Sequence, residues 1–242
     1  MKFQHTVLML SAIIGIFSLI DCGGSKTPTA TPSPTAIAAQ DILNSAAQRF
    51  DQTNSLHFDL TVDGNVALDQ NGTIKLHGAT GDLKRPDSAQ AKANVTFLGA
   101  NLSISLVSIG TDEYMTNPIS GSWEKAPSDL GYDPAVLFDK NQGISHVIRN
   151  LQDPKIVGTD TVNGEDAYHI TGTVKKEDAE PIAGGALTSD SLPVDLWVDK
   201  QTNDVVKLVL HDSSGSGGNA ETTWTLLLTK QNESVTIDKP SV

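Results

Sequence analysis

Residues 89–97 read Ala-Gln-Ala-Lys-Ala-Asn-Val-Thr-Phe, and residues 101–106 read Asn-Leu-Ser-Ile-Ser-Leu. Apolar and polar side chains alternate in both stretches. A period of two is typical of a β-strand with one face buried and the other in water. Such strands occur in antiparallel sheets that carry a core on one side only, so these two stretches predict an antiparallel sheet with one apolar face.

The same alternation recurs before and after this pair. Asn71-Gly72 and Asn163-Gly164 each separate two such stretches and are typical of tight hairpin turns. Further strands are expected at residues 57–63, 73–77, 157–162, 167–174, 194–199, 206–211, 224–229 and 235–237. A sheet of about nine or ten strands is expected to curl.

Three segments have the spacing of amphipathic helices. The first covers residues 42–50, the second starts at Asp133-Pro134 and reaches Phe138, and the third covers residues 144–151, before Pro154. Residues 175–193 are expected to form a long polar connection, and their length and glycines suggest a mobile edge. The order helix, strands, two helices, strands predicts an α+β fold with the helices on one face of the sheet.

Cys22 is the only cysteine and follows an apolar stretch at residues 6–20. A short apolar stretch behind a basic residue is typical of a secretion signal, and ~15 residues are too few to cross ~30 Å of hydrocarbon. The pattern predicts a signal peptide at residues 1–21 and a lipid on the Cys22 thiol. Asp21 departs from the Gly, Ala or Ser usual at that place, so an ordinary signal peptide or an uncleaved anchor stays open.

Residues 22–36 are rich in Pro, Thr and Ala and predict an extended tether of about 40 Å. Residues 37–242 are then expected to form a single domain, held at the membrane through the lipid on Cys22. This organisation places the domain on the extracytoplasmic face of the cell membrane.

The formal net charge of −12 excludes nucleic acid as a partner, because phosphates require a basic surface. It also argues against electrostatic adhesion to anionic lipid headgroups. The five histidines of the mature chain, His57, His77, His146, His169 and His211, lack metal-ligand spacing and are expected on solvated surface. No nucleophile motif or acid–base pair is present, so neither an enzyme nor a cofactor or metal site is expected.

The apolar face of the sheet has two interpretations. The three modest helices either close it completely, which makes a plain core, or stand away from it and leave an apolar cavity. The small side chains Ala89, Ala91 and Ala93 would leave space for the second arrangement. The residue pattern alone leaves both open.

Five segments in the same order resemble those of the LppX/LprAFG family of bacterial envelope lipoproteins. They are Ser55-Leu56-His57-Phe58-Asp59-Leu60-Thr61-Val62-Asp63-Gly64, Tyr132-Asp133-Pro134-Ala135 with Leu137 and Gly143-Ile144, residues 160–172, residues 192–199, and Val205-Val206-Lys207-Leu208. The resemblance runs from about Ile37 to Pro240. It implies a half-barrel of antiparallel strands similar to LolA and LolB, with helices over a concave apolar face.

The resemblance also implies a function, namely holding and moving acyl lipids or glycolipids of the envelope, with an exporter or acceptor protein as a further partner. The residues expected to line such a cavity are Leu60, Val62, Ile74, Leu76, Val95, Phe97, Leu102, Ile104, Leu106, Leu137, Ile144, Val147, Ile148, Leu151, Ile170, Val194, Leu196, Val206 and Leu208. The alternative is a membrane-anchored protein-binding or sensory module of the same fold without a lipid ligand.

Overall fold

The computed structural model describes residues 38–67, 72–127, 134–213 and 221–242. The expected signal peptide at residues 1–21, Cys22, the expected tether at residues 22–36, Asn71 and Asp133 therefore lie outside the described residues. Residues 37–242 form one compact unit. Every side chain of its hydrophobic core lies between Ala39 and Leu228, so this unit carries what it needs to fold on its own.

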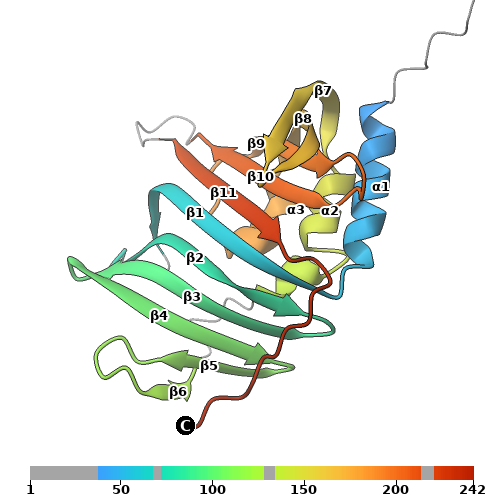
Figure 1. Cartoon of the computed structure of the whole chain (residues 1–242). Coiled ribbons are helices and arrows are strands. Elements are labelled where there is room, and N and C mark those ends of the chain that lie inside the picture. The colour runs from blue at the N-terminus through green and yellow to red at the C-terminus, as the bar shows by residue number, and fades with distance from the viewer. Residues whose placement is uncertain (1–37, 68–71, 128–133, 214–220) are drawn as a thin grey trace, which may run out of the picture. The chain divides into compact units, whose positions relative to one another are not determined.

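Among the described residues, eleven strands form a single antiparallel sheet (Figure 1). The elements in chain order are α1 (Ala39–Asp51), β1 (Ser55–Ala67), β2 (Ile74–Lys84), β3 (Ser88–Phe97), β4 (Ala100–Ile109), β5 (Asp112–Thr116), β6 (Trp123–Lys125), the 3-10 helix η1 (Pro134–Phe138), α2 (Ile144–Arg149), β7 (Gln152–Val162), β8 (Glu165–Lys175), α3 (Lys176–Ala179), the 3-10 helix η2 (Glu180–Ala183), β9 (Ser191–Asp199), β10 (Val205–Asp212) and β11 (Thr222–Thr229).

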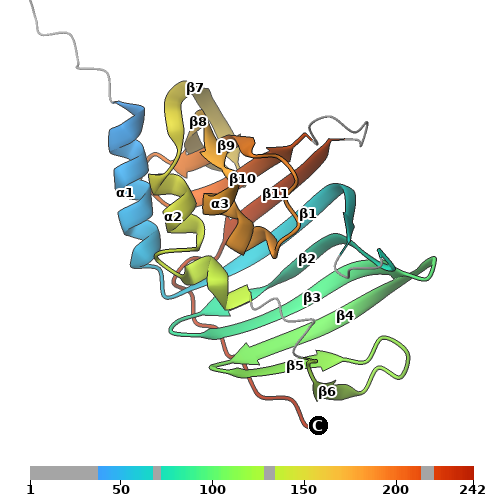
Figure 2. The ribbon, with the colours of Figure 1, turned by 180° about the vertical axis from the view of Figure 1, so that it is seen from behind.

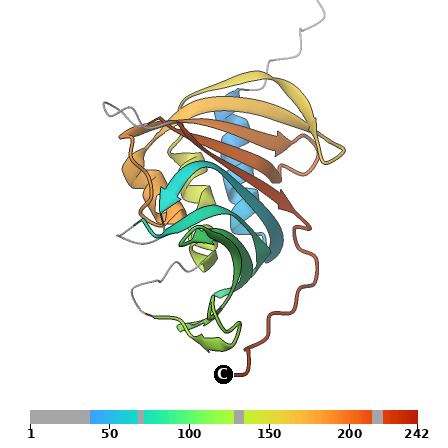
Figure 3. The same ribbon diagram turned by 90° about the vertical axis from the view of Figure 1, so that its left-hand side faces the viewer.

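The strand order is β6-β5-β4-β3-β2-β1-β11-β10-β9-β8-β7, so two meanders join where β1 pairs with β11. Seen from the side, the sheet is strongly curled and the helices lie within its curve (Figure 3). The expected fold class is confirmed: an α+β half-barrel of antiparallel strands with helices on one face.

The helices cover the sheet unevenly. Figure 2 shows α1 and α2 over the half made of β7–β10, while η1 and the turn of α3 and η2 reach toward β1–β3. The face of β4 and β5 carries little helical cover in the same view. One half of the sheet is therefore closed by helices and the other half is closed only at its border.

Several boundaries differ from the expectations. Residues 235–237 are not a strand but part of the extended C-terminal segment, and residues 175–193 contain α3 and η2 instead of forming a plain loop. β5 and β6 have no counterpart among the expected strands. β7 begins at Gln152 and runs through Pro154, which is possible because it is an edge strand where a missing N–H breaks no pairing.

Arg85 in the turn between β2 and β3 links the helices to the sheet. Its guanidinium donates to the carbonyl oxygens of Thr53 at 2.7 Å, Phe138 at 2.9 Å and Phe50 at 3.4 Å. It also lies 4.4 Å from the centroid of the Phe138 ring. The end of α1 and the end of η1 are thus held by one side chain at the border of the sheet.

Candidate functional site

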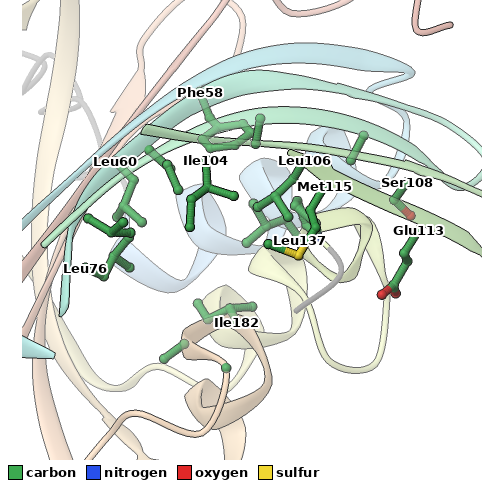
Figure 4. A pocket seen from close by; sticks show the side chains of 18 of the residues that line it. Phe58, Leu60, Leu76, Ile104, Leu106, Ser108, Glu113, Met115, Leu137 and Ile182 are labelled. Atoms are coloured by element: carbon green, nitrogen blue, oxygen red, sulfur yellow. The ribbon is translucent and has the colours of Figure 1, made fainter. Parts of the chain in front are cut away.

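A cavity of about 290 Å³ lies on the concave side of the β1–β5 half of the sheet (Figure 4). Pockets for small molecules have volumes of ~300–1,000 Å³, and this cavity is at the lower end of that range. Its walls are predominantly apolar. It is lined by Phe58, Leu60, Ile74, Leu76, Ala79, Ala89, Ala91, Ala93, Val95, Ile104, Leu106, Val107, Ser108, Glu113, Tyr114, Met115, Ala126, Pro134, Leu137, Ile182, Ala183, Gly184, Leu210, Trp224 and Leu226.

Small side chains explain why space remains here. Ala93 pairs with Ala79 on one neighbouring strand and with Ile104 on the other, and all three line the cavity. Ala89 and Ala91 extend this small-residue stripe along β3. Helical cover is also thin on this side, as Figure 2 shows, and a volume of about 290 Å³ stays open.

The structure brings seven of the expected lining residues to the cavity wall. Six come from neighbouring strands and the seventh from η1, which forms the facing side. They are Leu60, Ile74, Leu76, Val95, Ile104, Leu106 and Leu137.

Eight other expected lining residues lie in the closed half and fill it. They are at most 5% exposed and belong to the same hydrophobic core, with α1 packed beside α2. They are Ile144, Val147, Ile148, Leu151, Ile170, Val194, Leu196 and Leu208. The two interpretations of the apolar face thus describe different halves of one sheet, a packed core and a cavity.

The remaining four have other places. Val62 is buried in the core, whereas Phe97 and Leu102 are half-buried beside the β3–β4 turn. Val206 lies on the opposite face, in a small cluster with Trp197. A β-bulge between Val205 and Lys207 shifts the alternation of β10 by one residue and turns Val206 away from the concave side.

Some lining residues were outside the expectations. Phe58 continues the alternation of Leu60 and could have been found from it. Ile182 and Ala183 of η2 and Gly184 directly after it line the cavity, inside the segment expected to be a polar connection. No periodicity marks these three residues, so only the folded chain shows them.

One end of the cavity is polar. Ser108 on β4 is directly opposite Glu113 on β5, and both line the cavity. Ser108 is 3% exposed, and its Oγ has no hydrogen-bond partner among the described residues. Figure 4 shows both side chains at the same end of the cavity, with their oxygens directed away from the sheet. A buried hydroxyl without a partner is costly, and a ligand oxygen would satisfy it.

The opposite face of the sheet carries a polar network instead of isolated histidines. Asp195 accepts from His169 at 2.5 Å and lies 3.3 Å from Nε2 of His211. Trp197 stacks on His169 with 4.3 Å between centroids and donates from Nε1 to Asp160 at 2.8 Å. His169 and His211 are therefore partly exposed and share one carboxylate, because neighbouring strands join residues that are far apart in sequence.

Within the four described ranges, no group of three or more His, Cys, Asp or Glu side chains is placed to hold a metal ion. No helix in that part of the chain combines the length and the apolar character needed to span a membrane.

Two solved structures resemble this fold. LprF from Mycobacterium bovis aligns with a TM-score of 0.67 over 84% of this chain and 97% of its own, at 21% identity. The Mycobacterium tuberculosis lipoprotein LppX aligns with a TM-score of 0.60 over 83% of this chain and 98% of its own, at 17% identity. At these identities the likeness shows the fold alone.

Sequence comparison finds named relatives over most of the chain. The chain is 28% identical, over 241 residues and the full length of both proteins, to a lipoarabinomannan carrier protein LprG of Mycobacteroides abscessus. It is 25% identical over 207 residues to a putative diacylated glycolipid transporter LprF of Mycobacterium bovis. This alignment covers 79% of this chain and 74% of that protein. The model of the LppX_LprAFG lipoprotein family matches residues 38–237, which confirms the resemblance seen in the five segments. This chain belongs to the LppX_LprAFG lipoprotein family.

Proposed function

We propose that this protein is a membrane-anchored lipid carrier that holds acyl chains of an envelope lipid or glycolipid in its cavity. The observation that carries the proposal is the apolar cavity on the thinly covered half of the sheet. The names of the relatives agree with it, since one is a lipoarabinomannan carrier protein and another a putative diacylated glycolipid transporter. No reaction is required, so the function needs no catalytic group.

The energetics of lipid transfer set what the cavity must provide. Each methylene removed from water contributes ~0.8 kcal/mol, so a chain of about 16 carbons loses roughly 13 kcal/mol on leaving a membrane for water. An apolar wall compensates this loss without recognising individual atoms. The wall of leucine, isoleucine, valine and alanine side chains has this character.

Direct binding tests the proposal. Purified residues 37–242 should bind a fluorescent acyl lipid delivered from detergent micelles, with saturation at about one equivalent or a small integer number. An unlabelled diacylated glycolipid should displace it. Absence of saturable binding with several chain lengths would contradict a carrier function.

The polar end of the cavity is proposed to hold the headgroup. The Glu113 carboxylate accepts hydrogen bonds from hydroxyl groups and repels an anionic phosphate, while Ser108 can donate to an ester or sugar oxygen. Such an arrangement favours a neutral, hydroxyl-rich headgroup over an anionic one at this position.

Replacing these two residues should change headgroup selectivity. Glu113→Gln is expected to weaken binding of a glycosyl diacylglycerol about tenfold, since it loses one charge-assisted hydrogen bond, and to strengthen binding of phosphatidylglycerol. Ser108→Ala should weaken glycolipid binding too, yet stabilise the empty protein by about 1 kcal/mol because it removes an unpaired buried hydroxyl. Competition titrations and urea unfolding measure both, with the exposed Glu124→Gln as control. Equal changes for both lipids would contradict a headgroup site here.

The segment from Lys175 to Pro193 is proposed as the gate. Its η2 residues line the cavity, and Asp212 on β10 fixes its far end. The Asp212 carboxylate accepts from the N–H groups of Thr188 at 2.8 Å and Ser189 at 2.9 Å, and from the Thr188 hydroxyl. Burial raises the pKa of Asp212, but these hydrogen bonds outweigh it and leave the pKa below its ordinary value of 3.8.

Asp212→Ala is expected to accelerate lipid exchange and to lower the free energy of unfolding by about 2 kcal/mol, because it leaves buried N–H groups unpaired. A group with a depressed folded pKa contributes stability that is present above its unfolded pKa. The contribution of Asp212 should therefore be complete well above pH 3.8 and be lost as pH falls below that value. Stopped-flow lipid release and urea unfolding at pH 7 and pH 3 check both parts. An unchanged release rate would remove this segment as the gate.

The anchor is proposed to be a diacylglyceryl group on Cys22, which would hold the domain on the extracytoplasmic face of the membrane through the tether of residues 22–36. There the carrier would meet an exporter or acceptor protein. Intact mass of the protein from its own host tests the anchor, and a free Cys22 thiol would remove it while leaving the cavity proposal in place.

A further inference from the structure

Two large apolar side chains stand in water at the tips of neighbouring hairpins. Leu98, in the turn between β3 and β4, is 76% exposed, and Ile119, in the turn between β5 and β6, is 86% exposed. Because β4 pairs with β5, both turns lie at the same end of the sheet, as Figures 1 and 2 show. Both side chains are therefore exposed at one end of the sheet, in a chain whose formal net charge is −12.

Leu98 is also poorly suited to its backbone conformation. Its φ is +49° and is followed by Gly99 at +84°, the left-handed pair that two-residue hairpin turns require. Asn or Gly is strongly preferred at the first of these positions, and a bulky apolar residue there carries strain. Since the side chain is mostly exposed, packing within the domain does not offset this cost.

Ile119 is held out by a structured turn. The Asn117 side-chain oxygen accepts from the N–H groups of Ile119 at 2.9 Å and Ser120 at 3.1 Å. The Asn117 backbone exchanges two 2.8 Å hydrogen bonds with Gly121 and Ser122. The exposed isoleucine is therefore presented by an ordered backbone, which lowers the entropy lost when it binds.

The β3–β4 tip continues the wall of the cavity. Ile74, which lines the cavity, pairs with Phe97, the residue directly before Leu98. On the same concave side, Val95 of the cavity wall pairs with Leu102. Phe97 and Leu102 are only half-buried, so apolar side chains run without a break from the cavity to the exposed tip.

Charge and size indicate which partner fits these tips. Residues 96–101 and 117–122 contain no charged side chain. Two protruding side chains are far from the ~800 Å² per partner that a stable protein interface buries. Apolar side chains that stand out singly are instead suited to insertion among lipid chains, where their hydrocarbon surface is removed from water.

We propose that Leu98 and Ile119 insert into the surface of a lipid bilayer and dock this end of the sheet on it, so that acyl chains pass between the bilayer and the cavity at this end. This inference rests on the proposed carrier function. The contact is apolar and independent of anionic headgroups, which agrees with the acidic charge of the chain. The tether would keep the domain near the membrane, and the two tips would orient it.

Flotation of residues 37–242 with neutral phosphatidylcholine vesicles tests the proposal, because this unit lacks both the signal peptide and Cys22. Leu98→Asn and Ile119→Ser should each lower the vesicle partition coefficient about tenfold or more. Leu98→Asn should leave the melting temperature unchanged or raise it, since Asn tolerates a positive φ. The matched control is Val157→Ser on the edge strand β7, which removes a side chain that is 55% exposed and should not change partition.

Lipid uptake from detergent micelles separates this proposal from the carrier function. The expected pattern is normal uptake from micelles and slow uptake from vesicles in both tip variants. Unchanged vesicle partition and transfer, with uptake from micelles intact, would overturn the docking proposal and leave the carrier standing. Concentration-dependent dimerisation abolished by Leu98→Asn would also overturn it in favour of a contact between two copies. Absence of uptake by the unmodified domain from either source would overturn the carrier function itself.

Discussion

Ala93→Trp is expected to abolish binding of acyl lipids while leaving the domain folded. Ala93 lies in the middle of the cavity wall, with Ala79 and Ile104 beside it on the neighbouring strands. An indole at this position enters a space of about 290 Å³ and takes the place of an acyl chain. Because the space is already empty, the larger side chain replaces no packed neighbour, and unfolding free energy should change by less than about 1 kcal/mol.

Two matched substitutions separate a blocked cavity from a damaged fold. Lys92→Trp adds the same side chain one residue earlier on the exposed face of β3 and should leave lipid binding unchanged. Ile148→Trp enlarges a residue that is 1% exposed in the filled half and should destabilise the domain by about 1–3 kcal/mol. Titration with a fluorescent lipid and urea unfolding measure the three variants. If Ala93→Trp destabilises the domain as much as Ile148→Trp does, the space near Ala93 is packed core and not a binding cavity.

Arg85→Ala is expected to lower the free energy of unfolding by about 3–4 kcal/mol. The guanidinium donates to carbonyl oxygens at the ends of α1 and η1, and hydrogen bonds from a charged donor contribute ~1.5–3 kcal/mol each without being additive. Removing the donor takes this partner from the Thr53 and Phe138 carbonyls in a half-buried place, while the Phe50 carbonyl keeps the N–H of Thr53. Burial also lowers the pKa of Arg85, with Asp51 and Asp139 acting in the opposite direction.

Two other substitutions at this turn serve as controls for Arg85→Ala. Arg85→Lys keeps the charge but offers one ammonium in place of a planar fork that reaches three carbonyls, so it should recover only part of the stability. Lys84→Ala, at the exposed neighbouring position, should change stability by less than about 0.5 kcal/mol. Urea unfolding measures the stability of the three variants. If Arg85→Ala lowers the free energy of unfolding by less than about 1 kcal/mol, the hydrogen bonds of Arg85 contribute little to stability.

The alternation of apolar and polar residues was sufficient to predict the sheet, its apolar face and the alanine stripe of β3. The period of two assigns a side to each residue, and it correctly puts six strand residues on the concave side at the cavity, namely Leu60, Ile74, Leu76, Val95, Ile104 and Leu106. The same rule misplaces Val206, because the bulge after Val205 inserts one residue into the alternation. Nothing in the order of apolar residues marks such an insertion.

Which part of the apolar face is cavity could not be predicted from the pattern. Ile148 and Leu137 have the same helical signature, yet Ile148 fills the core and Leu137 faces the cavity. The difference arises from where α2 and η1 sit over the curled sheet, which depends on long-range packing. Ile182 lines the cavity because of how the η2 segment folds back. The polar residues around it in the sequence give no sign of this.

The most direct test of the central claim is native mass spectrometry of the protein purified from its own host, with lipid extraction of the same sample. A carrier should retain an acyl lipid at a fixed stoichiometry, and Ala93→Trp purified in parallel should lack it. If the unmodified protein carries no lipid and takes up none when lipid is offered, the cavity is not a lipid site, and a protein-binding or sensory module would replace the carrier.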